Sequence, residues 1–425
     1  MYSQLGTLPV TGERVRIARA ARRWVSVSRN VVYLRLTSMF TDISSEMVNA
    51  VLPLYLVVQL RFSPLVFGAF AGAYQGVTAL GRLVTGLIAD RRVRHKEVAG
   101  AGYAVSAICK LGLLIAGGAW MATSAVLFVD RTGKGIRTTP RDALISLSSP
   151  SERLGEAFGV HRALDTLGAL AGPLLAFALL SLTLGAFDAI FVASFCLALV
   201  GLGFLLFFVR NAGEEHRPTS ASRVSLGAAL RLFHERGFRT IVLVGLSLGL
   251  VTIADAFVYL TFQTRSSLSF SFFPLLYAGT AISYLALAIP AGRLADRFGR
   301  GRVFLAGYAL LLGVDALLLA PSPGAVVVIA ALVTLGAYYA ATDGVLMALA
   351  SGVLPPHLRG SGLALVATAT TVAQFAASLV FGALWTWHGL NGSVVVFTVG
   401  IAAALPLAAI ALRRTARRAG LASFF

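Results

Sequence analysis

The sequence predicts an all-α membrane protein with twelve transmembrane helices in two pseudo-symmetric six-helix halves. Of its 425 residues, 57% are hydrophobic and only 13% are charged, against roughly 25% charged in a soluble domain. Apolar runs of about 20 residues, long enough to cross a hydrocarbon core of roughly 30 Å, recur along the whole chain. The motif at 86–96 (GLIADRRVRHK) returns at 292–302 (GRLADRFGRGR), 206 positions later. A repeat at half the chain length indicates two related halves.

Twelve apolar runs are expected to span the membrane as helices. Helices are favoured over a membrane β-barrel because barrel strands alternate polar and apolar residues, and these runs do not. The expected spans are 31–58, 65–89, 98–117, 119–146, 156–180, 187–209, 239–261, 272–293, 303–320, 324–350, 361–384 and 392–411.

The spans divide the chain into two bundles with basic segments around them. The N-terminal half is expected over 31–210 and the C-terminal half over 239–412, joined by a cytoplasmic linker at 211–238. Residues 1–30 form a basic lead-in and residues 413–425 a basic tail. A second landmark repeats at a spacing of 205 positions: Pro150 and Gly155, then Pro355 and Gly360.

The formal net charge of +18 is interpreted as membrane topology rather than nucleic-acid binding. Lysines and arginines gather in the loops on one side of the expected topology, whereas the opposite loops carry only Arg61 and Arg265. This positive-inside bias places both termini in the cytoplasm and the basic segments near lipid head groups. Examples of the clustered residues are Arg14, Arg91, Arg92, Arg94, Lys96, Arg210, Arg236, Arg413 and Arg414.

The cysteines and the N-terminus add two further expectations. Cys109 and Cys196 both lie inside expected spans, so no disulfide is inferred. No apolar run precedes residue 31, so no cleavable secretory signal is expected. Residues 1–29 are arginine-rich and poor in acids, as in a mitochondrial transit peptide, but a basic cytoplasmic lead-in is the favoured interpretation.

Both copies of the repeated motif place a glycine four residues before an aspartate–arginine pair. The residues concerned are Gly86, Asp90 and Arg91, then Gly292, Asp296, Arg297 and Gly299. This Gly-x-x-x-Asp-Arg element, followed by basic residues, resembles the loop signature of the major facilitator superfamily. The stretches TDISSEM, DRTGKGIRTTPRDALI and GEAFGVHRALDTLGALAGP resemble a bacterial and archaeal branch of that superfamily, in which some members are described as nickel-resistance exporters.

The resemblance implies a secondary active transporter that works by alternating access, and neither an enzyme nor a cofactor-binding protein. Proton-coupled export (antiport) of a small solute, either a metal ion or chelate or an organic compound, is the favoured function. The alternatives are uptake of a small solute or metallophore, and a non-transporting receptor or scaffold of the same fold. The expected partners are the substrate, protons and the lipid bilayer, with no nucleic acid, for a monomer in the cytoplasmic (inner) membrane.

The repeated loops are expected to act as latches between the halves. Gly86 and Gly292 would allow close helix approach. In the family, the motif's aspartate lies at the N-terminus of a helix in the opposite half, where the helix dipole favours negative charge. Asp90 would then contact the helix start near Gly360, and Asp296 the start near Gly155. Such a latch would stabilise the outward-open state and release on inward opening.

The span at 119–146 is unusually rich in charge. Arg131 lies near the membrane midplane, where an uncompensated charge costs at least about 3 kcal/mol, so it must face the cavity or a partner. A helix-4 motif of proton-coupled members is matched by Arg131, Gly133, Gly135 and Pro140. Arg137, Arg141 and Asp142 are expected to reach the cytoplasmic interface by extending along the helix.

Acids in the first and seventh spans are candidates for proton coupling or substrate binding. Asp42 and Glu46 are four residues apart, on one helical face. Their counterpart in the second half is Asp255, which aligns with Glu46. Acids at this depth favour a proton relay or a site for a cationic substrate. The alternative is a closed salt-bridge network around Arg131 that serves folding or gating.

The fifth span adds His161, Arg162 and Asp165 to these candidates, with His161 and Asp165 again four residues apart. Its Gly168, Gly172 and Pro173 resemble the Gly-x-x-x-Gly-Pro element of proton-exchanging exporters, although ordinary helix packing gives similar spacing. No metal site is assigned. Other residues expected in the cavity are Tyr338, Tyr339, Asp343 and Gln374, whereas Lys110 requires an unidentified acidic partner.

Overall fold

The computed structural model describes residues 29–77, 95–147, 154–183, 185–210, 232–266, 268–355 and 358–419. Within these ranges the ordered elements are helices, and no strand occurs. The N-terminal half contains α2 (Arg29–Leu54), η1 (Tyr55–Gln59), a helix at 64–77, α4 (His95–Ala116), α5 (Trp120–Leu147), α6 (Leu154–Leu182) and α7 (Phe187–Phe208). The prediction of an all-α protein is confirmed.

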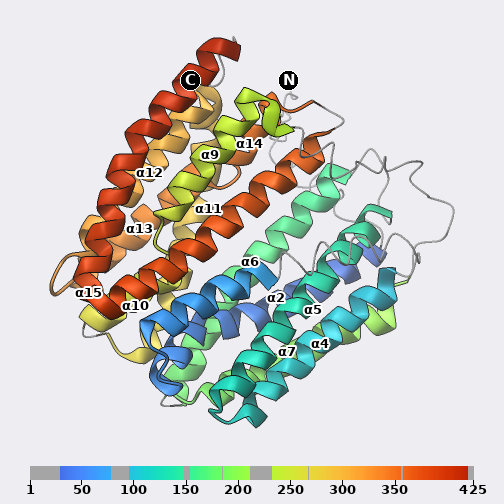
Figure 1. Ribbon diagram of the computed structural model, residues 1–425. Helices are drawn as coiled ribbons and strands as arrows, with labels where there is room; N and C mark the ends of the chain where they lie inside the picture. Colours follow the sequence, from blue (N-terminus) through green and yellow to red (C-terminus); the bar gives the residue numbers. More distant parts are fainter. Residues whose placement is uncertain are drawn as a thin grey trace, which may run out of the picture.

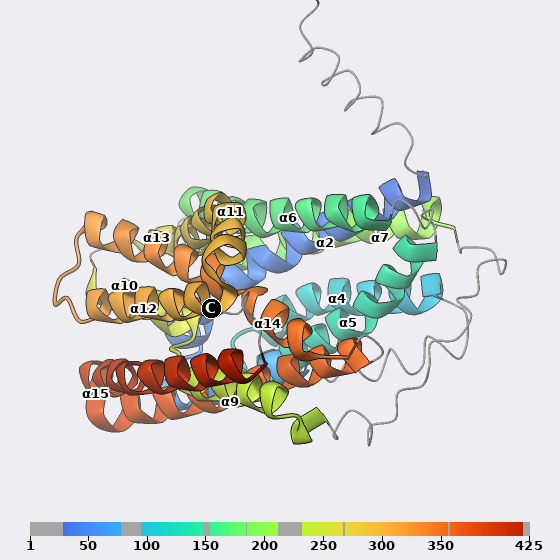
Figure 2. The same ribbon diagram turned by 90° about the horizontal axis from the view of Figure 1, so that it is seen from above.

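The C-terminal half is built from a longer series of elements in the described ranges. Its elements are η3 (Leu232–His234), α9 (Arg236–Leu250), α10 (Asp255–Arg265), η4 (Phe270–Phe272), α11 (Phe273–Phe298), α12 (Arg300–Leu318), α13 (Ala325–Thr342), α14 (Val345–Val353) and α15 (Arg359–Ala419). The two halves lie side by side, blue to green against yellow to red (Figure 1). Figure 2 shows α6 of the first half beside α11 of the second.

Eight helical stretches in the described ranges are long and apolar enough to cross a membrane. One of them, Gly362–Arg417, has 56 residues, room for two passes of about 20 residues each. It turns at Gly389, whose φ of 74° and ψ of 172° are not helical. The chain is therefore a multi-pass membrane protein, and the count of twelve spans stays a prediction consistent with this arrangement.

Two spans expected to be continuous helices are broken in the C-terminal half. The first break separates α9 from α10 at residues 251–254, where three consecutive β-branched residues, Val251, Thr252 and Ile253, disfavour helix. The second separates α13 from α14 at Gly344, whose φ of 77° is in the left-handed region. Neither break was anticipated from hydropathy, which does not register a short unwound turn.

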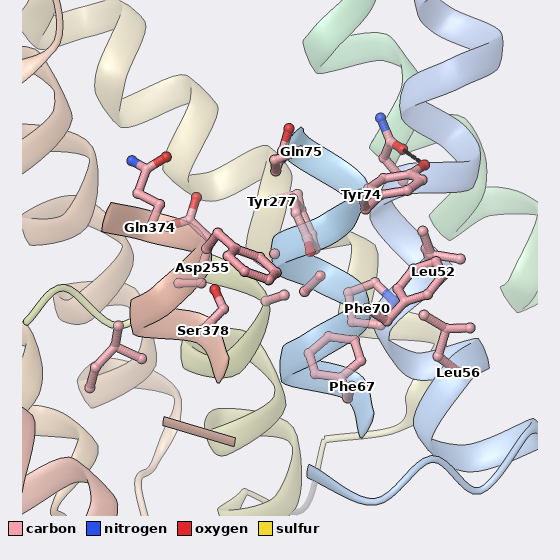
Figure 3. A pocket seen from close by; sticks show the side chains of 18 of the residues that line it. Leu52, Leu56, Phe67, Phe70, Tyr74, Gln75, Asp255, Tyr277, Gln374 and Ser378 are labelled. Atoms are coloured by element: carbon pink, nitrogen blue, oxygen red, sulfur yellow. Dashed lines mark hydrogen bonds between the residues drawn. The ribbon is translucent and has the colours of Figure 1, made fainter. Parts of the chain in front are cut away.

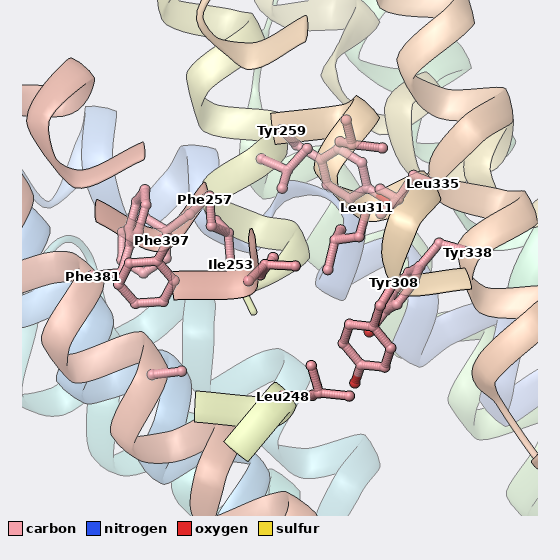
Figure 4. Packing of buried hydrophobic residues seen from close by; sticks show 14 of the residues in the cluster. Leu248, Ile253, Phe257, Tyr259, Tyr308, Leu311, Leu335, Tyr338, Phe381 and Phe397 are labelled. Atoms are coloured by element: carbon pink, nitrogen blue, oxygen red, sulfur yellow. The ribbon is translucent and has the colours of Figure 1, made fainter. Parts of the chain in front are cut away.

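The interior of the C-terminal half is packed with aromatic rings. Phe257 on α10 lies 4.8 Å from Phe381 on α15, which in turn lies 5.1 Å from Phe397, measured between ring centroids (Figure 4). Tyr308 and Tyr338 form a second pair at 5.3 Å. This packing holds α10, the short helix after the break, against α15 and so fixes the N-terminus of α10, where Asp255 lies.

The halves touch backbone to backbone at one end of the bundle. A Cβ atom added to Gly68 would overlap the carbonyl of Ser378, and one added to Gly382 would overlap the carbonyl of Pro64. Only glycine permits so close an approach of two helices. We call this the closed end, defined by residues 64–68 of the first half and 378–386 of the second.

Further contacts between the halves lie toward the closed end. The backbone N–H of Leu65 donates to Thr386 Oγ1 at 3.1 Å, and Phe67 meets the edge of Phe257 at 5.0 Å. Ser271 Oγ donates to the carbonyl of Leu180 at 3.4 Å. The opposite end carries basic residues of both halves, and we call it the arginine-rich end. It is defined by Arg210, Arg236, Arg300 and Arg413.

Candidate functional site: a central cavity between the halves

A central cavity of about 380 Å³ lies between the halves, beside the closed end (Figure 3). The N-terminal half contributes Glu46 and Asn49 from α2, Tyr74 and Gln75 from the helix at 64–77, and Arg131 and Lys134 from α5. The C-terminal half contributes the unwound residues 252–254, Asp255, Tyr277, Tyr338, Tyr339 and Gln374. The cavity therefore has one wall from each half, and both walls carry charge.

A ladder of polar contacts joins α5 to α2. Its four rungs are Arg131 with Asn49, Lys134 with Glu46, Arg137 with Asp42, and Arg141 with Ser38. The residue number rises along α5 as it falls along α2, so the two helices run antiparallel and each rung lies about one turn from the next. The ladder begins at the central cavity and runs toward the arginine-rich end.

The first rung places Arg131 in the cavity wall with 5% of its surface exposed. Its Nη2 donates to Asn49 Oδ1, and the guanidinium lies over the ring of Tyr74, 4.0 Å from the centroid. The Tyr74 hydroxyl donates to the same Asn49 oxygen at 3.1 Å. Arg131 is thus held by an amide and an aromatic ring, and its Nε has no hydrogen-bond partner among the described residues.

The remaining rungs are ion pairs or charge-assisted hydrogen bonds. Lys134 Nζ lies 3.5 Å from Glu46 Oε1, where both side chains are partly exposed to the cavity. Arg137 Nη2 lies 3.6 Å from Asp42 Oδ1, and its side chain is 1% exposed. The expectation that Arg137 extends to the interface is therefore wrong, because an acid on the neighbouring helix holds it inside the bundle.

The last rung brings Asp165 of α6 into the ladder. Arg141 Nη1 donates to Ser38 Oγ at 2.9 Å, and Ser38 Oγ in turn lies 3.1 Å from Asp165 Oδ1 and 3.4 Å from Asp42 Oδ2. The expectation that Arg141 extends along the helix to the interface is also wrong, because its guanidinium donates to Ser38 on the neighbouring helix. Asp42 and Asp165 therefore share one hydroxyl donor below the cavity.

The glycines of the fifth span lie directly behind the acids of α2. A Cβ added to Gly172 would lie 2.7 Å from Cβ of Glu46, and one added to Gly168 would lie 3.1 Å from Cβ of Asp42. The Gly-x-x-x-Gly-Pro element therefore lets α6 pack against α2 at the depth of the two candidate acids. Gly133 of the helix-4 motif plays the same part between α5 and α4, since its added Cβ would lie 3.0 Å from the carbonyl of Gly102.

The acidic partner of Lys110 is Asp130 on the next helix. Lys110 Nζ lies 2.6 Å from Asp130 Oδ1, and Ser106 Oγ donates to the same oxygen at 2.5 Å. Both charged side chains are buried, Lys110 to 2% and Asp130 to 8% exposure. The pair joins α4 to α5 away from the cavity, which accounts for a lysine in an otherwise apolar span.

The C-terminal wall is built from a carboxylate and tyrosines. Asp255 is the first residue of α10, where the helix dipole favours its negative charge, and the Tyr339 hydroxyl donates to its Oδ1. A side pocket of about 250 Å³ opens beside it. Its lining includes Glu46, Pro173, Asp255, Tyr259, Tyr277, Thr280, Tyr284, Tyr339 and Asp343. Glu46 and Asp255 border both spaces.

The structure brings together most of the residues expected at the site. Glu46, Arg131, Asp255, Tyr339 and Gln374 line the central cavity, whereas Asp42 and Asp165 lie below it in the ladder. The side chains of His161 and Arg162 lie outside the described part of the chain, as do Gly86, Asp90 and Arg91. The sequence analysis did not identify Asn49, Tyr74, Gln75, Lys134 and Tyr277 as site residues. Of these, Asn49 was the easiest to recognise, because it lies one helical turn beyond Glu46.

The second loop motif lies at the arginine-rich end, and among the described residues its aspartate has no hydrogen bond or ion pair to the opposite half. Asp296 Oδ1 lies 3.3 Å from Arg300 Nη2, with 71% of its side chain exposed. Gly299 joins α11 to α12 with a φ of 97°. A Cβ added to Gly292 would meet nothing within 4 Å among the residues that the structure describes, so the expected close helix approach is not seen at this position. Gly155, the expected partner position, lies outside the residues with described side chains.

The described residues contain no group of three His, Cys, Asp or Glu side chains placed to hold a metal ion. The helical bundle, its two related halves and the cavity between them define a membrane transporter. The family model of the Major Facilitator Superfamily matches residues 34–283 and 256–424. The chain belongs to this family, as the repeated motifs predicted, and is a secondary transporter and not an enzyme.

Relatives and solved structures agree with this assignment. An uncharacterized MFS-type transporter of Methanocaldococcus jannaschii is 29% identical over 389 residues, covering 88% of this chain and 94% of the relative. An uncharacterized protein of Mycobacterium tuberculosis is 32% identical over 164 residues, covering 39% of this chain and 40% of that protein.

Three transporters of known structure share the fold. The POT family transporter PepTSo has a TM-score of 0.76 at 13% identity, covering 91% of this chain and 98% of that one. The nucleoside transporter NupG has a TM-score of 0.72 at 17% identity, covering 90% and 98%. A D-xylose–proton symporter has a TM-score of 0.67 at 16% identity, covering 89% and 95%. At these identities the likeness establishes the fold alone.

Proposed function

We propose that the protein is a proton-coupled exporter of a small solute, either a metal ion or chelate or an organic compound. It works by alternating access as a monomer in the cytoplasmic membrane. By the positive-inside rule the arginine-rich end faces the cytoplasm, as do both termini. The contacts between the halves gather toward the closed end, which would then face outward. The described state is therefore interpreted as inward-facing, with the latch at Asp296 released.

The observation that carries this proposal is the pairing of Glu46 and Asp255 across one cavity. The two acids come from opposite halves, and both border the central cavity and the side pocket. A carboxylate inside a membrane protein that faces an accessible cavity is suited to take up and release protons. When the halves rock, such a group is exposed to each side of the membrane in turn.

Glu46 is the first candidate for the coupling residue. Its side chain is 29% exposed and its ion pair with Lys134 is long, at 3.5 Å. Protonation of Glu46 would remove the negative charge that holds Lys134 and leave the Lys134 ammonium group facing the cavity. Asp42, held at 3.6 Å by the nearly buried Arg137, and Asp255, bound by Tyr339, are the other candidates.

The test is made with Glu46→Gln in proteoliposomes. We expect this variant to lose export driven by a pH gradient yet keep downhill substrate exchange, because exchange needs only the binding site and the rocking motion. Glu235→Gln, an exposed acid before α9, is the matched control and should transport as the wild type does.

The outcomes separate the alternatives. A fall in melting temperature by Glu46→Gln with no effect on coupling would mark Glu46 as a brace for the ladder, since loss of one partner leaves a charge unpaired. If driven export, exchange and stability all stay unchanged, the coupling role moves to Asp42. Movement of the solute in the same direction as the protons, and not in the opposite direction, would establish the uptake alternative instead.

A further inference from the structure

The charges that line the central cavity do not neutralise one another within each wall. On the N-terminal wall Glu46 is matched by Lys134, and deeper in the ladder Asp42 is matched by Arg137. Arg131 lies within 4.0 Å of no carboxylate among the described residues, and its contacts are the amide of Asn49 and the ring of Tyr74. The N-terminal wall therefore presents one uncompensated positive charge.

The C-terminal wall presents the opposite sign. Asp255 receives a hydrogen bond from Tyr339, and no lysine or arginine of the described chain lies within salt-bridge distance of it. Tyr277, Tyr259 and Tyr284 border the pocket beside it. Aromatic faces around a carboxylate are the surroundings in which a desolvated ammonium group is stabilised, by cation–π attraction as well as by charge.

We infer that the central cavity binds a zwitterionic organic solute, with its anionic group against Arg131 and its cationic group against Asp255. This inference rests on the proposed transport function and names the class of its substrate. The Nε of Arg131, buried and without a partner among the described residues, supplies a further donor for an anion. Gln75 from the N-terminal wall and Gln374 from the C-terminal wall also line the cavity (Figure 3).

The charges decide against a substrate of a single sign. A cation bound at Asp255 would leave the charge of Arg131 uncompensated in a site of low dielectric. An anion bound at Arg131 would likewise leave the charge of Asp255 uncompensated. An unpaired buried charge is far more costly than one matched across a bound ligand. A zwitterion satisfies both walls at once, and because the walls belong to different halves, it draws the two halves together.

The experiment measures thermal stabilisation of the purified full-length protein by matched probes. The probes are 5-aminopentanoate, pentylammonium and pentanoate, which share a chain length and differ in charge. A series of straight-chain ω-amino acids from β-alanine to aminooctanoate covers the separation of the two charges. We expect the best zwitterion to bind at least about tenfold more tightly than either probe with one charge.

Variants assign the two ends of the probe. Arg131→Gln and Asp255→Asn should each weaken binding of the best zwitterion by about tenfold or more, as expected for loss of a charged hydrogen bond. Arg131→Lys keeps the charge and serves if Arg131→Gln fails to fold; it should retain the preference for a zwitterion. Arg236→Gln, exposed at the arginine-rich end, and Asp315→Asn, buried outside the cavity, are the matched controls and should bind as the wild type does.

The inference is overturned if pentylammonium or pentanoate stabilises the protein as well as the zwitterions do. It is also overturned if no member of the series stabilises the protein, or if both cavity variants keep wild-type binding. These outcomes are distinct from failure of the proposed function. Proton-coupled transport of solutes with a single charge would keep the function and remove the zwitterion site, whereas zwitterion binding without proton-coupled movement would do the reverse.

Discussion

The two halves share a fold but stabilise their interiors in different ways. The N-terminal half joins its helices with ion pairs, in the ladder between α2 and α5 and in the Lys110–Asp130 pair. The C-terminal half relies on tyrosines and phenylalanines, and its helices break twice beside the cavity. A repeat thus conserves the path of the chain while each copy acquires its own chemistry.

The contrast is sharpest at a pair of related positions. Lys110 on α4 and Asp315 on α12 are 205 positions apart, the spacing that separates Pro150 from Pro355. Lys110 is neutralised by Asp130, whereas Asp315 is fully buried and neither carboxylate oxygen has a hydrogen-bond partner among the described residues. The first half has completed a buried pair where the second carries an acid alone.

The largest effect is expected from breaking the complete pair. Lys110→Met should lower the free energy of unfolding by about 3–5 kcal/mol, because Asp130 is left as a buried charge without its cation. The double variant Lys110→Met/Asp130→Leu should recover most of that loss, since an apolar pair needs no compensation. Thermal unfolding of the three proteins measures both steps, and a double variant as unstable as the single one would contradict the explanation.

The next effect tests the glycine packing behind the acids. Gly172→Ala should lower stability by about 1–3 kcal/mol, because the added methyl group would press on the α2 backbone at 2.9 Å from the carbonyl carbon of Glu46. Gly203→Ala, where nothing lies within 4 Å, should be neutral or slightly stabilising. Equal melting temperatures for the two variants would show that α6 and α2 are not so closely packed.

Removing the solitary acid should have the opposite sign. Asp315→Leu is expected to raise the free energy of unfolding by about 1–3 kcal/mol, because it removes a buried polar group that lacks partners. Asp315→Asn keeps the shape and the polarity, so it should gain less. Denaturant or thermal unfolding compares the two, and destabilisation by Asp315→Leu would reveal a partner that forms in another state of the protein.

The smallest effect concerns the loop at the arginine-rich end. Asp296→Asn should slow transport while folding stays nearly intact, because the lost charge–dipole contact is about 1 kcal/mol and biases one conformation. Arg300→Gln removes the neighbouring cation but keeps the acid, so it should transport close to the wild-type rate. Asp90→Asn is expected to act as Asp296→Asn does. Wild-type rates in both aspartate variants would rule out the latch.

Sequence reasoning reached the fold and part of the site for identifiable physical reasons. Apolar runs and a half-length repeat determine a two-half membrane bundle, because hydrocarbon admits few other structures. Charged residues at midplane depth are costly, so Glu46, Arg131 and Asp255 were recognisable as residues facing a cavity. Each of these inferences depends on how deep a residue lies in the membrane, and this depth follows from its position along a single helix in the sequence.

The parts that could not be anticipated depend on rotation and on contacts between helices. Arg137 was assigned to the interface because depth alone does not reveal that Asp42 lies opposite it. The break before Asp255 was missed because unwinding at 251–254 leaves hydropathy unchanged. Asn49 and Tyr74 gain their importance from their contacts with Arg131, which lies on another helix.

The glycines of the closed end determine how this end can open. Gly68 and Gly382 face backbone carbonyls of the opposite half, so no side chains interlock at these two positions. Two backbone surfaces with no side chains between them can separate together, whereas interlocked side chains would have to change rotamer one after another. We therefore expect the closed end to open in a single step, and the rate of this step to depend on hydration of the backbone that becomes exposed. Larger residues in place of either glycine would prevent the closed end from closing fully and would let solute leak through.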